Sequence, residues 1–228
     1  MIFKKIFGKR TIDKMDKKIN LLGATSKYDS ITILSVRLIT SILLFILIFS
    51  NFKHGYLLGI GFVIIYYYVF EYVVIDSKIK KREKKINSEA IYFFEVLTLS
   101  LQTGRNLAEA ILITVNSVDG ELSIEFKEAL RETNFGKSLT ESLTDMQKKI
   151  PSDSVNNIVL ALTQANIYGS SIIATLNNQI DYLREKRKME IKAQITKVPT
   201  KVSIISVFFF IPLILLIILG PILLNYIG

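Results

Sequence analysis

The chain has 228 residues, half of them hydrophobic, with no cysteine and a formal net charge of +9. That hydrophobic share is too high for an ordinary soluble domain of this length and indicates a membrane protein. The lack of cysteine excludes disulfides and thiolate metal sites. The positive charge suits either nucleic acid or an anionic membrane surface, and its position along the chain decides between them.

The first predicted elements are a basic cytosolic N-terminal segment at residues 1–32 and a transmembrane hairpin at residues 33–75. The segments Ile33–Ser50 and Tyr56–Ile75 are each close to the roughly 20 apolar residues that cross a bilayer, and the polar sequence NFKHG separates them. The N-terminal segment does not predict a cleavable signal, because about 30 polar and basic residues precede the first span and no small-residue cleavage site follows it.

A basic linker at 76–85, a cytosolic helical bundle at 86–198 and a C-terminal transmembrane helix at 199–228 complete the predicted order. The prolines in the last segment are compatible with a transmembrane helix, because membrane helices tolerate proline. Lysine and arginine cluster before the first span, after the second and before the third. The positive-inside rule therefore predicts a cytosolic N-terminus and bundle and an outside C-terminus. At these edges the charge can meet anionic lipid, so nucleic acid is not needed to explain it.

The region between the second and third spans predicts helices, because apolar residues recur at helical spacing and no long stretch alternates. We expect an all-α membrane protein with three transmembrane helices and a six-helix bundle built from three helical hairpins. The expected helices are 86–102, one after Asn106, 121–133, one after Ser138, 152–168 and one from Ser171 to Val198. The sixth is expected to be a stiff connection to the membrane that kinks or restarts at Pro199.

Three sequences of similar pattern, TGRNLAEAI, FGKSLTESL and YGSSIIATL, mark the predicted turns. In each, a glycine can close one helix in the left-handed conformation, and a polar residue two positions later can cap the next helix. Glu109 and Glu141 follow two of these caps by three residues, which resembles a capping box. The turn residues are Gly104, Asn106, Gly136, Ser138, Gly169 and Ser171.

The second turn contains Gly136-Lys137-Ser138, which resembles the end of a phosphate-binding loop. Such a loop needs another glycine five positions earlier, after a buried strand. The chain has Arg131 there, within the charged helical pattern FKEALRETN. We therefore interpret the motif as a helix–helix turn.

No set of residues in the sequence predicts catalysis, a metal site or a cofactor, so we expect no enzyme. The one histidine, His54, lies in the short loop between the first two spans. Glu71, near the cytosolic end of the second span, could be a functional carboxylate, reach the interface or pair with the basic cluster after Ile75. Arg37, at the same level of the first span, is another plausible partner. The acidic sequence DGELSIEFKE lacks calcium-loop spacing, and its default interpretation is a solvated face.

The repeated turns, the order of hairpin, bundle and terminal span, and the sequences VPTKV and ILGPIL together resemble the type II secretion system F domain. The similarity is closest to the TadC-like platform proteins of tight-adherence (Flp, type IVc) pilus machines, which have a single bundle. The resemblance implies a platform protein in the cytoplasmic (inner) membrane that couples a secretion ATPase to pilin extraction and filament assembly. The implied partners are that ATPase, a sister F-domain platform protein and pilins, in a homo- or hetero-oligomer.

A basic run on the sixth predicted helix is the candidate contact for the ATPase, with lipid headgroup binding or a solvated helix face as alternatives. Its residues are Arg184, Lys186, Arg187 and Lys188. An alternative function is a membrane-tethered signalling or adaptor protein whose bundle binds a cytosolic partner.

Overall fold

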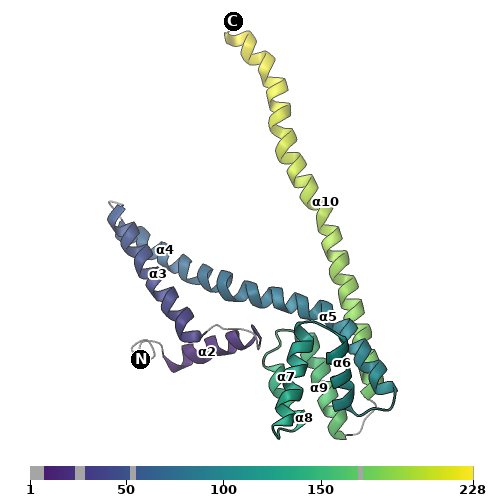
Figure 1. Ribbon diagram of the computed structural model, residues 1–228. Coiled ribbons are helices and arrows are strands. Elements are labelled where there is room, and N and C mark those ends of the chain that lie inside the picture. The colour runs from purple at the N-terminus through teal and green to yellow at the C-terminus, as the bar shows by residue number, and fades with distance from the viewer. Residues whose placement is uncertain (1–7, 24–28, 52–54, 169–171, 228) are drawn as a thin grey trace. The chain divides into compact units, whose positions relative to one another are not determined.

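The computed structural model describes residues 8–23, 29–51, 55–168 and 172–227, and these residues form helices without any strand (Figure 1). The all-α prediction is therefore confirmed for the described part of the chain, whereas three spans and a closed six-helix bundle stay predictions. The elements are α2 (Lys9–Asn20), α3 (Ser30–Asn51), α4 (Gly55–Glu71), the π-helix η1 (Tyr72–Asp76), α5 (Ser77–Gln102), α6 (Leu107–Ser117), α7 (Glu121–Asn134), α8 (Leu139–Gln147), α9 (Asp153–Tyr168) and α10 (Ile172–Ile227). The chain divides into two units, and the boundary falls between Ile180 and Asp181.

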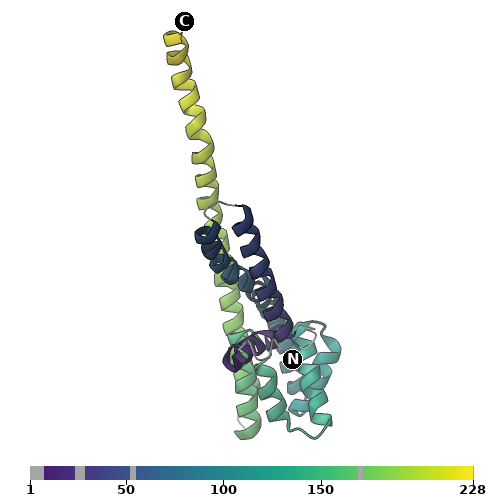
Figure 2. The same cartoon turned by 90° about the vertical axis from the view of Figure 1, so that its left-hand side faces the viewer.

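Helices α3 and α4 pack against each other as a hairpin, which Figure 2 shows from the side. Gly59 of α4 permits this approach, because a Cβ there would lie only 3.1 Å from the ring of Phe45. Tyr66 also donates a hydrogen bond of 2.7 Å to the hydroxyl of Thr40 across the hairpin. By length and composition, Ser30–Ser50 can cross a membrane, and α4 is an apolar helix of 17 residues.

Helices α4, η1 and α5 follow one another without a break from Gly55 to Gln102, and we call this continuous helical segment the rod. Residues 76–85, predicted as a basic linker, are helical: Asp76 ends η1, and residues 77–85 form the first turns of α5. Lysine, arginine and glutamate are good helix formers, so a charged segment without glycine or proline continues a helix readily. At about 1.5 Å per residue the rod is about 70 Å long.

Helix α2 was not predicted, and it packs against the base of the hairpin, where α3 begins and α4 ends. Its apolar side chains recur at helical spacing and are buried against the start of α3 and against η1. The resulting small core consists of Met15, Ile19, Ile33, Leu34 and Ile75. We call α2 the clasp, because it contacts both α3 and the rod.

The bundle consists of the second half of α5 and helices α6 to α9, and the first turns of α10 contribute the buried Leu176 and Ile180. Consecutive helices from α5 to α9 contact each other, and α5 also contacts α7 and α9. Three fully buried aromatic rings lie at its centre: Phe93 and Phe126 stack with centroids 4.7 Å apart, and Phe94 meets both rings edge-on. Aliphatic residues complete the core, including Ile86, Leu97, Ile111, Leu122, Leu143, Ile158, Leu162, Leu176 and Ile180.

Two glycines close helices of the bundle in the left-handed region. Gly104 has φ +81° and Gly136 has φ +94°. The N–H of Gly136 bonds to the carbonyl of Thr133 at 3.0 Å, and the N–H of Lys137 bonds to the carbonyl of Glu132 at 3.4 Å. This pair of bonds is the Schellman arrangement, in which otherwise unsatisfied carbonyls at the helix end find donors.

The residue two positions after each of these glycines caps the next helix. Asn106 accepts a hydrogen bond of 2.9 Å from the N–H of Glu109, and Ser138 accepts one of 3.2 Å from the N–H of Glu141. Each turn thus supplies hydrogen-bond partners to backbone groups at the end of one helix and at the start of the next, within a few residues. The residues of the third predicted turn lie outside the described residues: Gly169 and Ser171.

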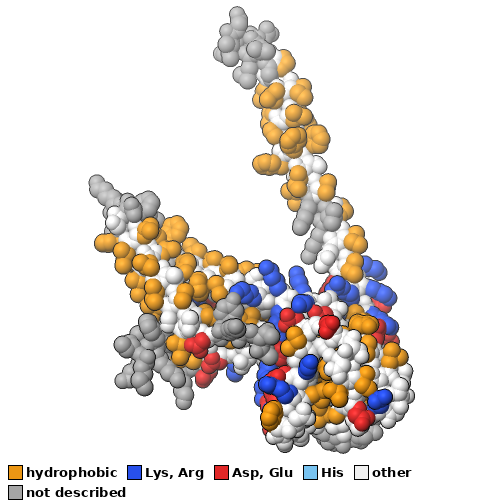
Figure 3. Space-filling model, in the orientation of Figure 1, with side chains coloured by type: hydrophobic (Ala, Val, Ile, Leu, Met, Phe, Trp, Pro, Cys, Tyr) orange, Lys and Arg blue, Asp and Glu red, His pale blue; other side chains and the backbone are white. Residues whose placement is uncertain are grey.

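Helix α10 continues through Pro199, Pro212 and Pro221, so the helix does not restart at Pro199, and a kink there stays a prediction. Its segment Val202–Leu219, in the second unit, can cross a membrane by length and composition. None of that segment is buried within the chain, and Figure 3 shows hydrophobic side chains all along it. Such a surface requires an apolar environment.

Candidate functional site at the base of the hairpin

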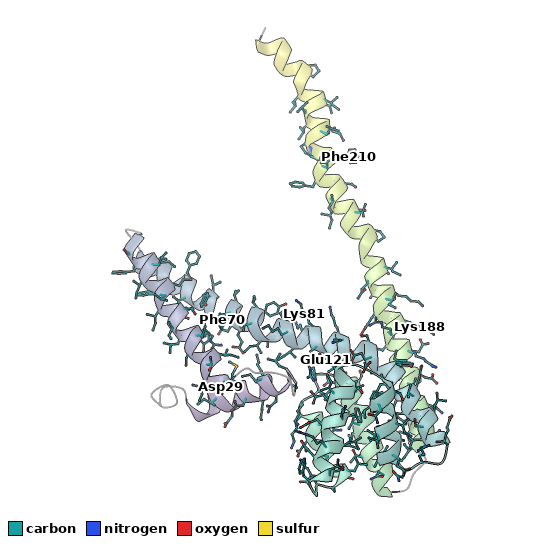
Figure 4. All side chains as sticks on the ribbon, in the orientation of Figure 1. Asp29, Phe70, Lys81, Glu121, Lys188 and Phe210 are labelled. Carbon is teal, nitrogen blue, oxygen red and sulfur yellow. The ribbon has the colours of Figure 1, made fainter. Side chains whose placement is uncertain are left out.

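Arg82 on the rod is buried and joins four parts of the chain. Its guanidinium donates hydrogen bonds to Glu125 at 2.6 Å and to the carbonyls of Lys149 and Leu21 at 2.7 and 2.8 Å. A longer bond of 3.4 Å reaches Glu121. Figure 4 shows Glu121, at the start of α7, near the part of the rod that carries Lys81. Arg82 therefore fastens the rod to α7, to the α8–α9 connection and to the chain after the clasp.

The planar guanidinium explains why arginine occupies this position. It presents five donors in fixed directions, so one side chain can serve carboxylates and backbone carbonyls together. Gly23 leaves room for the guanidinium, because a Cβ at this position, which has φ +93°, would lie 2.5 Å from it. Glu125 is 2% exposed, so the predicted solvated face of the acidic segment is wrong at this residue. Its burial is tolerated because Arg82 pairs with it.

A second charged cluster joins the clasp to the hairpin. Glu71 accepts bonds from Arg37 at 2.8 Å and from Lys18 at 2.6 Å, and Lys18 also reaches Asp76 at 2.9 Å. The predicted Arg37–Glu71 pair is confirmed, and the second partner of Glu71 comes from the clasp instead of the basic cluster after Ile75. Partial burial alone would lower the pKa of Lys18, but the hydrogen bonds to Glu71 and Asp76 raise it above its ordinary value.

Arg37 is 4% exposed although it lies on a candidate membrane span. Its guanidinium carbon is 3.4 Å from the centroid of the Tyr67 ring, in addition to the bond with Glu71. The face of the ring and the carboxylate together offset the free-energy cost of removing the guanidinium from water. The hairpin is therefore held at its base by charge pairing within the protein.

Lys137, of the sequence that resembles a phosphate-binding loop, lies between two carboxylates. It donates to Glu132 at the end of α7, at 2.7 Å, and to Asp145 of α8. These bonds raise the pKa of Lys137. The hydrogen bonds from Lys137 and then from Lys148 lower the pKa of Asp145 to about 2. The lysine thus joins the two helices of the turn.

We expect Lys137→Met to lower the unfolding temperature at neutral pH, and we expect this difference from wild type to shrink as pH falls. The folded pKa of Asp145 is about 2, below the ordinary value of about 3.9. Its stabilising effect is therefore complete above pH about 4 and is lost as pH falls towards 2. Thermal unfolding of the detergent-solubilised chain, followed by circular dichroism at fixed pH values between 2 and 7, would measure this difference in unfolding temperature. Lys127→Met, at an exposed lysine of α7, is the control, and a Lys137→Met difference that stays constant down to pH 2 would contradict the assignment.

The predicted basic run lies on α10, in the second unit. Three of its four side chains are exposed and that of Lys186 is half-buried. Arg184 pairs with Asp181 at 3.2 Å, and Lys188 pairs with Glu185 at 2.8 Å. Exposed pairs of this spacing contribute little to stability. The hydrogen bond from Lys188 lowers the pKa of Glu185. The run also contains Lys186 and Arg187.

Among the residues that the structure describes, no group of three or more histidine, cysteine, aspartate or glutamate side chains could hold a metal ion. His54 lies outside them.

The chain matches the family of type II secretion system (T2SS), protein F, over residues 93–220. This match covers more than half of the 228 residues, so the chain belongs to that family. Its members are membrane platform proteins of type II secretion and type IV pilus-like systems. No curated protein and no solved structure matches the chain. The match begins inside the bundle, so the clasp, the hairpin and Arg82 lie outside it.

Proposed function

We propose that the chain is a cytoplasmic-membrane platform protein, closest to the TadC-like group, that couples a cytosolic secretion ATPase to pilin extraction and filament assembly. The observation that supports this most is the rod: one unbroken helix carries the apolar α4 at one end and the core residues Phe93 and Phe94 at the other. A helix transmits rotation and displacement along its axis, whereas a flexible linker absorbs them. Force applied to the bundle would therefore reach the hairpin.

The proposed topology has three spans: α3, α4 with the start of η1, and the apolar part of α10. Seventeen residues of α4 are just enough to span a bilayer, and the first residues of η1 add apolar length. The N-terminus and bundle lie in the cytosol and the C-terminus lies outside, in line with the positive-inside rule. The basic run at Arg184–Lys188 is proposed to contact the ATPase or anionic lipid, and a sister platform protein and pilins complete the assembly.

We expect a flexible insertion in the rod to separate binding from transmission. Six Gly and Ser residues would be inserted between the exposed Lys80 and Lys81, where the rod has left the hairpin core and has not reached Arg82. The tagged variant, purified from solubilised native membranes, should still recover the ATPase and the sister protein, as identified by mass spectrometry. Filament or secreted protein should fall at least tenfold.

The control carries the same six residues between the exposed Gly104 and Arg105, in the α5–α6 turn, where the rod has already ended. It should keep both partners and most filament output. Full output from the rod insertion would exclude transmission through the rod. Recovery of neither partner by the wild-type chain, from a complex shown to be intact, would favour the adaptor function.

A further inference from the structure

The rod contains one turn that is not α-helical. Over Tyr72–Asp76 it is a π-helix, and the N–H of Ser77 bonds to the carbonyl of Tyr72, five residues earlier. A π turn holds one residue more than an α turn and occurs mostly as a single turn inside α-helices, often at functional sites. This turn lies between α4 of the hairpin and α5 of the bundle.

The π turn places two carboxylates on the same face of the rod. Glu71 precedes the turn and Asp76 ends it, five residues later. In an α-helix, residues five apart point about 140° away from each other, whereas a turn with i to i+5 bonds brings them about one full turn apart. Lys18 of the clasp bonds to both carboxylates, at 2.6 and 2.9 Å. The bridge therefore fits the π form of the turn and not the α form.

The clasp contacts the rod within this turn, and Leu21, the residue directly after the clasp, contacts the rod beyond it. Ile75, inside the turn, is fully buried in the small core that contains Met15 and Ile19 of the clasp. Beyond the turn, the carbonyl of Leu21 accepts a bond from Arg82 at 2.8 Å. The clasp and Leu21 thus stabilise the π turn through the ammonium group of Lys18, the packing around Ile75 and the carbonyl of Leu21.

We propose that the clasp controls the helical register of the rod. While Lys18 bridges Glu71 and Asp76, the turn stays π-helical. When the clasp detaches from the rod, the turn becomes α-helical. The number of residues does not change, so the rod beyond the turn moves by the equivalent of one α-helical residue, about 100° of rotation and about 1.5 Å of length. The bundle turns with it, while the Arg37–Glu71 bond keeps α3 and α4 together. The consequence for filament assembly rests on the proposed function, but the conformational change does not.

The test measures the distance between hairpin and bundle in the purified full chain. The sequence has no cysteine, so the exposed Val36 of α3 and Lys127 of α7 can be replaced by cysteine and spin-labelled without background. Lys127 is on α7, which packs against the side of α5, so a rotation of the bundle with the rod changes its distance to Val36. Double electron–electron resonance in lipid nanodiscs should give one main distance for the wild-type background. Lys18→Met should raise the share of a second distance at least threefold.

Lys17→Met is the matched control, because Lys17 is an exposed neighbour on the same helix and should leave the distribution unchanged. A Lys18→Met distribution identical to that of wild type would overturn the proposal. Asp76→Asn, which weakens the bridge without removing the lysine, should give an intermediate share.

A second variant tests whether the π turn is the moving part. Deleting the exposed Val73 leaves four residues where the π turn has five. Four residues are enough for an α turn that keeps the following part of the rod in the same orientation. With this deletion, Lys18→Met should show a single distance again, and persistence of two distances would show that the motion arises elsewhere. No ATPase or pilin is present in these measurements, so their outcome is independent of whether the platform function is correct.

Discussion

Replacing Arg82 with methionine is expected to lower the free energy of unfolding of the first unit by about 3–5 kcal/mol, because it leaves a buried carboxylate without its cation. Arg82 is 8% exposed and Glu125 is 2% exposed, with 2.6 Å between their bonded atoms. The variant also loses the donors to the carbonyls of Leu21 and Lys149. Chemical unfolding of the detergent-solubilised chain, followed by circular dichroism, would measure the loss. Limited proteolysis should show earlier cleavage after the clasp.

The double variant Arg82→Met with Glu125→Met separates charge from packing. Replacing both members of a buried pair by apolar side chains is often nearly neutral, so most of the lost stability should return. Arg82→Lys keeps the charge but not the planar donors and should remain destabilised. A double variant that is as unstable as Arg82→Met would show that the backbone carbonyls, and not the carboxylate, account for the loss.

Replacing Phe126 with alanine is expected to cost about 3–5 kcal/mol of unfolding free energy. The ring of Phe126 is fully buried and contacts those of Phe93 and Phe94, with centroid distances of 4.7 and 6.2 Å. Its removal leaves a cavity between α5 and α7, lined by two aromatic rings that lose their neighbour. Hydrogen exchange measured by mass spectrometry should show faster exchange in the second half of α5 and in α7.

Phe135→Ala is the matched control for this second prediction. Phe135 is 82% exposed, so its removal should change stability by less than about 0.5 kcal/mol. Phe126→Leu fills most of the cavity, so its loss of unfolding free energy should lie between those of the two alanine variants. Equal effects of Phe126→Ala and Phe135→Ala would contradict the assignment of the aromatic cluster as the centre of the bundle.

The sequence predicts the helices where the signals are local. At Gly104 and Asn106 a helix stop and a cap lie two residues apart, and both act through their own backbone neighbourhood. The Arg37–Glu71 pair was also predictable, because a hairpin of two spans places residues at matching depth opposite each other. The clasp carried a readable signal as well, since Ile12, Met15 and Ile19 recur at helical spacing.

Arg82 was missed because nothing in SKIKKREKK distinguishes a buried cation from solvated ones. Its partners lie 39 to 67 residues away along the chain, so only the tertiary structure brings them together. One pattern could have identified it: Ile75, Ile79, Arg82 and Ile86 recur at intervals of three or four residues, which places the arginine on the apolar face of the rod. The π turn has no sequence signal that we can identify.

The rod also bears on the order in which the protein is completed during synthesis. The clasp and hairpin are closed by contacts among residues 9–79, so they can form early, when the ribosome has made only that part. The guanidinium of Arg82, in contrast, waits for the carbonyl of Lys149, and the buried side chains of Leu176 and Ile180 emerge later still. Domains made first generally fold first. We therefore expect the nascent chain to complete its hairpin while half of the rod is still without its bundle, with the apolar face of α5 exposed.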